Sequence, residues 1–339
     1  GQLTFNVTDQ LHLIGGLRYA DDQKDADLLT TIKPGTSALF RALIASGQNR
    51  PGQERSEDRV TYMFTLQYDI SDNVMAYATY GTGSKSGGFN ANPVNQNIPL
   101  EFQEEKSDTI EAGIKSTFLE GRAMLNLNVY QMDVDGIQTT TINPNATGFI
   151  VGNAGDRRSR GVELELALKP IEALTLRGSF AYLDAEYTSY KNGSCPVVNP
   201  GIPAGSRPGT CNFSGYRPFH SPKTTASLAA DYSAPLGQGL AAFAGVDVSF
   251  TGKLNTVESL DPRGEEDATT LLAARFGVET EDGRWRVTAF GRNLTDEKYY
   301  TASTNLILNS LMSAAAPGAT PPGAFAGAGG YVGWYAPPR

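Results

Sequence analysis

The sequence is poor in the residues that carry most protein chemistry. His12 and His220 are its only histidines, and Cys195 and Cys211 are its only cysteines. With so few of these side chains, most zinc sites and most Ser–His or Cys–His catalytic arrangements are hard to build. We therefore expect no enzyme activity, no catalytic residue, no cofactor and no metal site in this chain.

Long apolar runs and an excess of positive charge are also missing. No stretch approaches the roughly 18 consecutive apolar residues of a transmembrane helix. The 28 basic residues are outnumbered by 36 acidic ones, which gives a net charge of −8. Nucleic acid is not an expected partner, because phosphate binding requires clustered Lys and Arg. No signal-peptide pattern precedes the first strand, so we expect a piece of a larger protein.

What the sequence has in quantity is apolar–polar alternation with a period of two. Between Val60 and Ile70 every second side chain is apolar or aromatic, and Met63 is the one apolar side chain on the other face. This period predicts strands and excludes an amphipathic helix. The 37 glycines and 19 prolines agree with a β protein of many turns. We predict twelve strands, at residues 2–8, 11–22, 57–70, 74–84, 104–118, 122–134, 155–168, 174–187, 222–233, 240–253, 268–280 and 284–294.

The strands are long, and the connections between them alternate in length. Many strands have 11 to 15 residues, whereas strands of soluble proteins average about five or six. Short turns such as 71–73 and 119–121 alternate with long connections such as 188–221. This asymmetry is typical of outer-membrane barrels, with short periplasmic turns and long extracellular loops. The predicted fold class is therefore all-β, an antiparallel up-and-down transmembrane β-barrel.

Four motifs in chain order carry a family resemblance. They are GSKSGGFN at 83–90, NAGDRRSRGVELE at 153–165, GRNLTDEKYY at 291–300 and GWYAPPR at 333–339. Over essentially all 339 residues the sequence resembles the barrel of TonB-dependent outer-membrane receptors of the iron–siderophore type. The resemblance implies a partial barrel, about twelve of the roughly 22 strands of the family. Residues 1–339 would be its C-terminal part, with the plug domain and the closing strand absent from the sequence.

The resemblance also implies a function and a location. The protein would be an active-transport receptor in the outer membrane of a Gram-negative bacterium, in contact with outer-membrane lipid. It would take up a ferric siderophore or a related small-molecule chelate, energised by the TonB complex through the missing plug segment. The same machinery could serve a non-iron substrate such as a carbohydrate.

Two further alternatives belong to other classes of protein. A self-contained porin or enzyme on a 12-strand barrel requires the first and last predicted strands to pair, and an even strand number permits this. A soluble all-β module with carbohydrate affinity would have shorter strands, and its connections would not be sorted by length.

The two cysteines fall in one predicted extracellular loop, 188–221. The medium outside the cell is oxidising, so we predict a disulfide between Cys195 and Cys211, and the alternative is two free thiols. Closing a loop of this size would stabilise it by on the order of 3 kcal/mol.

The same loop is rich in aromatic and cationic side chains. These suit an anionic, ring-bearing ferric chelate through stacking and charge. The alternative is a loop that packs on its neighbours without touching a ligand. Our candidate ligand contacts are Tyr190, Phe213, Tyr216 and Arg217.

A mixed set of charges lies on the polar faces of the predicted strands. In the family the barrel wall holds the plug by polar contacts, so the resemblance implies that these residues face the lumen. Arg157, Arg158 and Arg160 form a basic cluster that we interpret as a solvated strand start or as partners of nearby glutamates. The alternative is attraction of lipopolysaccharide phosphate or of an anionic ligand. The predicted lumen-facing residues are Glu111, Lys115, Glu163, Glu165, Arg177, Arg275, Arg286 and Arg292.

Overall fold

The computed structural model is built almost entirely of strands. It describes residues 1–29, 34–35, 50–90, 100–142, 149–196, 200–205, 210–305 and 331–335. Within these ranges the one helical element is the 3₁₀ turn η1 (Pro262–Gly264). No helix of the described residues is long and apolar enough to cross a bilayer.

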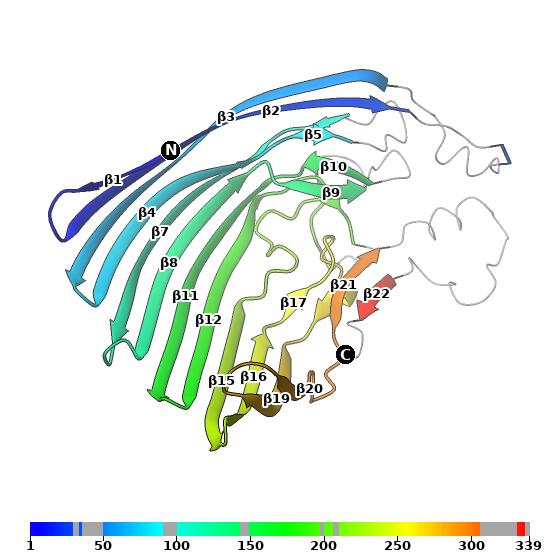
Figure 1. The fold of residues 1–339 in the computed structure, drawn as a ribbon. Helices are drawn as coiled ribbons and strands as arrows, with labels where there is room; N and C mark the ends of the chain where they lie inside the picture. Colours follow the sequence, from blue (N-terminus) through cyan, green and yellow to red (C-terminus); the bar gives the residue numbers. More distant parts are fainter. Residues whose placement is uncertain are drawn as a thin grey trace.

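Twelve strands form one antiparallel sheet, in which each strand pairs with its neighbours in chain order. Figure 1 shows them side by side in a curved, open sheet, with the tight turns along one edge. The strands are β1 (Gln2–Asn6), β2 (Leu11–Leu28), β3 (Arg50–Ser71), β4 (Val74–Lys85), β7 (Glu105–Phe118), β8 (Ala123–Asp135), β11 (Asp156–Ile171), β12 (Leu174–Ser189), β15 (Thr224–Gly237), β16 (Leu240–Thr251), β19 (Thr269–Thr280) and β20 (Arg286–Gly291).

The long connections contain small two-stranded hairpins of their own, near the opposite edge of the sheet (Figure 1). Sequence alternation did not predict these, because their strands are only two to six residues long. The hairpin strands are β5 (Gly88–Phe89) with β6 (Glu101–Phe102), β9 (Gln138–Ile142) with β10 (Phe149–Asn153), β13 (Gly193–Ser194) with β14 (Thr210–Cys211), β17 (Leu254–Asn255) with β18 (Glu265–Glu266), and β21 (Tyr300–Asn305) with β22 (Tyr331–Tyr335).

The tight turns use left-handed backbone. Leu119, Glu120 and Gly121 have φ angles of 53°, 57° and 81°, and Gln238 and Gly239 have 56° and 76°. Turns with positive φ twist in the sense that matches the right-handed twist of paired strands. They therefore let neighbouring strands reverse direction within a few residues.

The register gives the sheet one apolar and one polar face. Ile114, Leu127 and Leu164 lie side by side on β7, β8 and β11. Ile114 and Leu127 are 46% and 43% exposed, and exposed apolar side chains continue across the same face of the sheet. The opposite face carries polar partners such as Asn128 and Glu163, which also lie in register. Such a face is suited to lipid, where side chains are apolar and backbone groups must be paired within the sheet.

The first long hairpin, β2–β3, extends further than predicted. Its register continues without an apolar pattern to Ala26, which pairs with Gln53. Charged side chains hold this part: Arg55 binds Glu101 at 2.7 Å, and Arg59 forms an ion pair with Asp22. Alternation predicts only the apolar part of a strand, so the predicted strands 11–22 and 57–70 leave out the charged extension.

The sheet remains open in the described residues. β1 and β20 lie at its two ends and each pairs with one neighbour. The pairing of first and last strands that a self-contained 12-strand barrel requires is therefore not formed. Strands of up to 22 residues also disagree with a soluble module of short strands.

The apolar face yields a test of its orientation toward lipid. Leu127→Arg would place a charge in the middle of the exposed apolar band. It should destabilise the full-length protein in membranes by about 2–4 kcal/mol, the usual cost for Arg at the bilayer midplane. Urea unfolding in lipid vesicles measures the effect. The control Leu127→Phe keeps the position apolar, and an equally small effect of both substitutions would contradict this orientation.

Candidate functional site

Three long connections meet at the edge of the sheet opposite the tight turns. The connection between β12 and β15 supplies most of a buried cluster, and the β8–β11 and β16–β19 connections pack against it. Tyr190 and Phe213 are 1% and 0% exposed, and their ring centroids are 5.4 Å apart. We call this group the loop cluster. Its buried members are Tyr187, Tyr190, Ile202, Cys211 and Phe213, with Ile137, Ala154, Cys195, Tyr216 and Leu260 packed around them.

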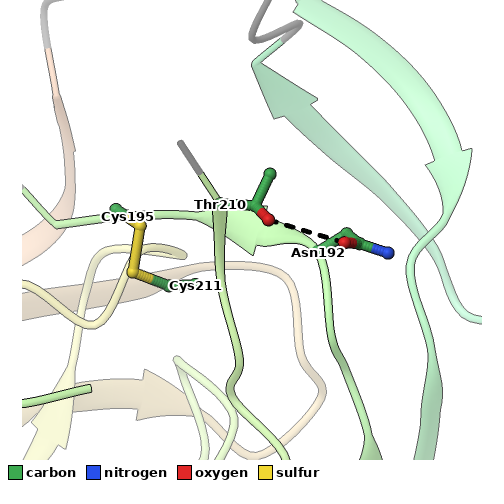
Figure 2. The surroundings of a disulfide bond; sticks show 4 residues. All are labelled: Asn192, Cys195, Thr210 and Cys211. Atoms are coloured by element: carbon green, nitrogen blue, oxygen red, sulfur yellow. Dashed lines mark hydrogen bonds between the residues drawn. A yellow bond between two sulfur atoms is a disulfide. The ribbon is translucent and has the colours of Figure 1, made fainter. Parts of the chain in front are cut away.

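A disulfide closes the largest of the three connections. Cys195 and Cys211 are bonded, with their Cα atoms 5.0 Å apart (Figure 2). The bond lies beside the β13–β14 pairing, where the Thr210 hydroxyl is 3.4 Å from the Asn192 side-chain oxygen (Figure 2). Cys211 lies in β14 and is buried in the loop cluster. The disulfide therefore ties the segment that follows β13, which carries Cys195, to the core of the loops.

A half-buried carboxylate ties the three connections together. Glu258, from the β16–β19 connection, accepts hydrogen bonds from the Thr139 hydroxyl on β9 and from the Tyr190 hydroxyl at 3.3 Å. Burial raises the pKa of Glu258, and the two hydrogen bonds oppose that shift. Burial also raises the pKa of Tyr190, so its hydroxyl stays a donor at neutral pH. Each connection thus contributes one polar group to a single junction.

The predicted ligand contacts divide into two pairs. Tyr190 and Phe213 are buried in the loop cluster, where packing leaves their rings no surface for a ligand. Tyr216 and Arg217 remain partly exposed. Tyr216 packs edge-on against Phe213, and Arg217 binds Asp184 and the backbone oxygen of Leu183, at 3.0 and 3.1 Å. Direct ligand contact therefore stays a prediction for Tyr216 and Arg217.

Side-chain amides hold the loop bases in place, and sequence reasoning missed them. The Asn90 side chain donates to the Val151 oxygen at 3.0 Å and accepts from the Val151 N–H at 2.7 Å, as a strand would. The Asn153 amide binds the Gly136 oxygen at 2.7 Å and the Gln103 backbone. Asn90 and Asn153 stand in two of the motifs, and that was the available signal.

Most of the predicted lumen-facing residues lie on the polar face of the sheet. Cross-strand partners place Lys115 beside Asn126 and Glu165, and Arg177 in line with Ala229 and Asp247. The same register puts seven of the eight on one side, opposite the apolar face: Glu111, Lys115, Glu163, Glu165, Arg177, Arg275 and Arg286. Arg292 follows the end of β20, and its guanidinium lies 5.8 Å from the centre of the Phe290 ring.

Most of these charges have partners on neighbouring strands. Arg275 forms ion pairs with Asp231 and Asp247, and Asp231 also pairs with Arg177. Arg286 lies 3.7 Å from the centre of the Phe243 ring. Arg177, Arg275 and Arg286 are thus held by acidic or aromatic partners. Among the described residues no group of three or more His, Cys, Asp or Glu is placed to hold a metal ion.

Glutamates on β7 and β11 are bound by amides and hydroxyls. Glu163 and Glu165 accept from Asn128 and Asn126 at 3.2 and 3.3 Å, and Glu111 accepts from the Tyr77 hydroxyl.

A family model settles what kind of protein contains this sheet. The model of the TonB-dependent receptor-like β-barrel matches residues 1–294. The chain belongs to this family. TonB-dependent receptor barrels lie in the outer membrane of Gram-negative bacteria, and the family consists of transport receptors rather than enzymes. The short turns of this barrel are therefore periplasmic, and the loop cluster is extracellular.

Two curated receptors, each named for a metal chelate, are similar in sequence to part of this chain. The metal-pseudopaline receptor CntO of Pseudomonas aeruginosa is 29% identical over 206 residues, which cover 60% of this chain and 25% of that protein. The ferric-pyoverdine 358 receptor of Pseudomonas putida is 30% identical over 171 residues, 48% of this chain and 18% of that protein. The chain thus spans a quarter or less of these two relatives.

A solved structure has the same fold. The ferric yersiniabactin uptake receptor FyuA from Yersinia pestis superposes with a TM-score of 0.66 and 17% identity. The match covers 89% of this chain and 40% of that one.

The disulfide should control how often the β12–β15 loop opens. Closure of a loop between cysteines that are 16 positions apart contributes about 3 kcal/mol. Reduction, or the double substitution C195S/C211S, should raise tryptic cleavage at the exposed Lys191 by up to roughly 100-fold. Mass spectrometry of the digested full-length receptor measures it. Cleavage at the exposed Arg122, beside the tight turn at 119–121, serves as the control, and equal cleavage at Lys191 before and after reduction would contradict the prediction.

The Glu258 junction should weaken as pH rises. A raised pKa means that the folded loops favour the protonated carboxyl, so stability is complete below the ordinary pKa of Glu and declines as pH rises through the elevated pKa. Amide exchange in residues 187–196 should therefore increase over this pH interval more in the native receptor than in Glu258→Gln. Taking the ratio of the two proteins at each pH removes the intrinsic pH dependence of exchange. A constant ratio would refute the prediction.

Proposed function

We propose that the full-length protein containing this chain takes up a ferric siderophore or a related metal chelate across the outer membrane. The observation that carries the proposal is the loop cluster, an ordered extracellular structure at the mouth of a TonB-dependent receptor barrel. A passive pore has no need of such a structure, whereas a receptor for a scarce ligand requires a preorganised surface.

The relatives support a metal chelate as the substrate. The two curated relatives are described as receptors for metal-pseudopaline and for ferric-pyoverdine, and the solved structure as a ferric yersiniabactin receptor. Each of these is a small organic chelate of a metal ion. We extend that class of ligand to this protein.

The ligand would first meet the partly exposed side chains of the β12–β15 connection. Tyr216 offers an aromatic ring for stacking, supported from behind by Phe213. Arg217 offers positive charge, held by Asp184 and by backbone oxygens. Aromatic and cationic groups together suit the rings and negative charge of a ferric chelate.

Transport through the barrel would depend on segments outside this chain. Lipid does not tolerate the free edges of β1 and β20, so we infer that further strands of the full-length protein close the barrel. A plug domain would occupy the lumen against the polar face. It would link the receptor to the TonB complex, and no step of covalent chemistry is proposed.

Growth under iron limitation tests the proposed function. A strain that lacks the full-length gene should grow poorly when one ferric siderophore is the only iron source, and the intact gene should restore growth. Loss of TonB should have the same effect. Normal growth and iron uptake across a panel of siderophores would overturn the iron assignment and favour another scarce nutrient, such as a carbohydrate.

The proposed contacts can be tested in the restored strain. Tyr216→Ala should raise the ligand concentration needed for half-maximal uptake by roughly tenfold, because one aromatic contact is lost. Lys169→Ala, at the periplasmic edge, should leave uptake unchanged. Equal uptake by both variants would remove Tyr216 from the site.

A further inference from the structure

Three arginines at the start of β11 point to opposite sides of the sheet. Arg157 pairs in register with Val134 and Tyr187, and it shares the polar face with Glu163. Arg158 and Arg160 lie on the other face, the one that carries the apolar band further down. The basic cluster of the sequence is therefore not one site, because a strand separates its members by face.

The two outward arginines are paired. Arg158 Nε binds Asp133 at 2.6 Å, and Arg160 Nε donates to the Gln131 side-chain oxygen at 2.9 Å. Salt links from this cluster to Glu163 and Glu165, which the sequence suggested, are not among the ion pairs of the described residues. The guanidinium groups of Arg158 and Arg160 are thus bound by side chains of the neighbouring strand β8.

Arg157 differs from both. Its Nε atom is buried and has no hydrogen-bond acceptor, and the guanidinium takes part in none of the ion pairs formed within the described residues. A buried N–H group without an acceptor is destabilising, and a guanidinium more so because it carries charge. Within the part of the chain that the structure describes, this donor therefore stays unsatisfied.

The place of Arg157 is the base of the loop cluster. Its register neighbours Val134 and Tyr187 are 3% and 5% exposed, and Tyr187 belongs to the cluster. Glu258 is the carboxylate of the cluster, but its hydrogen bonds go to Thr139 and Tyr190. Glu258 is thus engaged elsewhere, and the Nε donor of Arg157 has no acceptor among the described residues where the loops meet the polar face.

We propose that Arg157 binds an anionic oxygen of the transported ligand beneath the loop cluster. A guanidinium fits carboxylate, catecholate and similar oxygens through two parallel N–H groups, and it does so best where water is excluded. This assigns the ligand to the class of anionic chelates and adds an inner contact to the outer ones at Tyr216 and Arg217. The inference rests on the proposed function.

The experiment uses the full-length receptor, purified in detergent, and its intrinsic fluorescence as the binding signal. The anionic probes are a ferric tris-catecholate and ferric citrate, and the cationic probe is a linear ferric trihydroxamate. Arg157→Gln removes the positive charge on the polar face. Arg157→Lys keeps the charge but lacks the two parallel N–H groups of the guanidinium. Arg158→Gln is the matched control, because it removes the same charge one residue along on the other face.

Arg157→Gln should weaken binding of whichever anionic probe the receptor takes by roughly 10- to 100-fold, the range expected for a lost charge-assisted hydrogen bond. Arg157→Lys should lie between Gln and wild type, and Arg158→Gln should match wild type. The loss should shrink at high salt, because screening weakens the charge contribution in all variants.

Other outcomes overturn the inference. Unchanged affinity in Arg157→Gln with a lowered melting temperature would mean that an acid elsewhere in the receptor is the partner. A wild-type receptor that prefers the cationic probe, or binds none of the three, would contradict the anionic class. The growth assay is independent, so siderophore-dependent growth with an Arg157→Gln strain that takes up iron like wild type would reject the inference and retain the proposed function.

Discussion

The structure depends on one constraint: in lipid, every backbone N–H and C=O group must find its partner inside the sheet. Neighbour-by-neighbour antiparallel pairing from β1 to β20 meets this requirement along eleven consecutive interfaces. Long strands, tight turns on one side and an exposed apolar face all follow from it. The polar face is then free to carry charges, because it is shielded from lipid by the sheet itself.

Periodicity was sufficient to predict the sheet. The twelve predicted strands correspond to the twelve strands of the sheet, because side chains of a membrane strand must alternate between lipid and interior. The predicted strand ends were wrong where the strands extend beyond the apolar band, because side chains there no longer alternate between apolar and polar. Strand β3 begins at Arg50 rather than at residue 57, since its outer part is held by ion pairs and not by apolar contacts.

The loops were harder to predict because their packing has no period. The aromatic ring of Phe213 suggests a ligand contact, yet the same ring is buried in the apolar core of the loop cluster. Composition cannot distinguish these roles, since both require large apolar surface. The motif points to Asn90, but one sequence does not identify Val151 as its hydrogen-bond partner, because the two residues lie 61 positions apart.

The length of the β2–β3 hairpin carries it well beyond the membrane on the extracellular side. At about 3.3 Å per residue, the 22 residues of β3 reach roughly 70 Å, while the apolar belt of such barrels is about 25 Å tall. Even when tilted, much of the ribbon stands clear of the bilayer. Arg59 pairs with Asp22 across the two strands, so the ribbon presents a hydrogen-bonded, charged surface beyond the membrane.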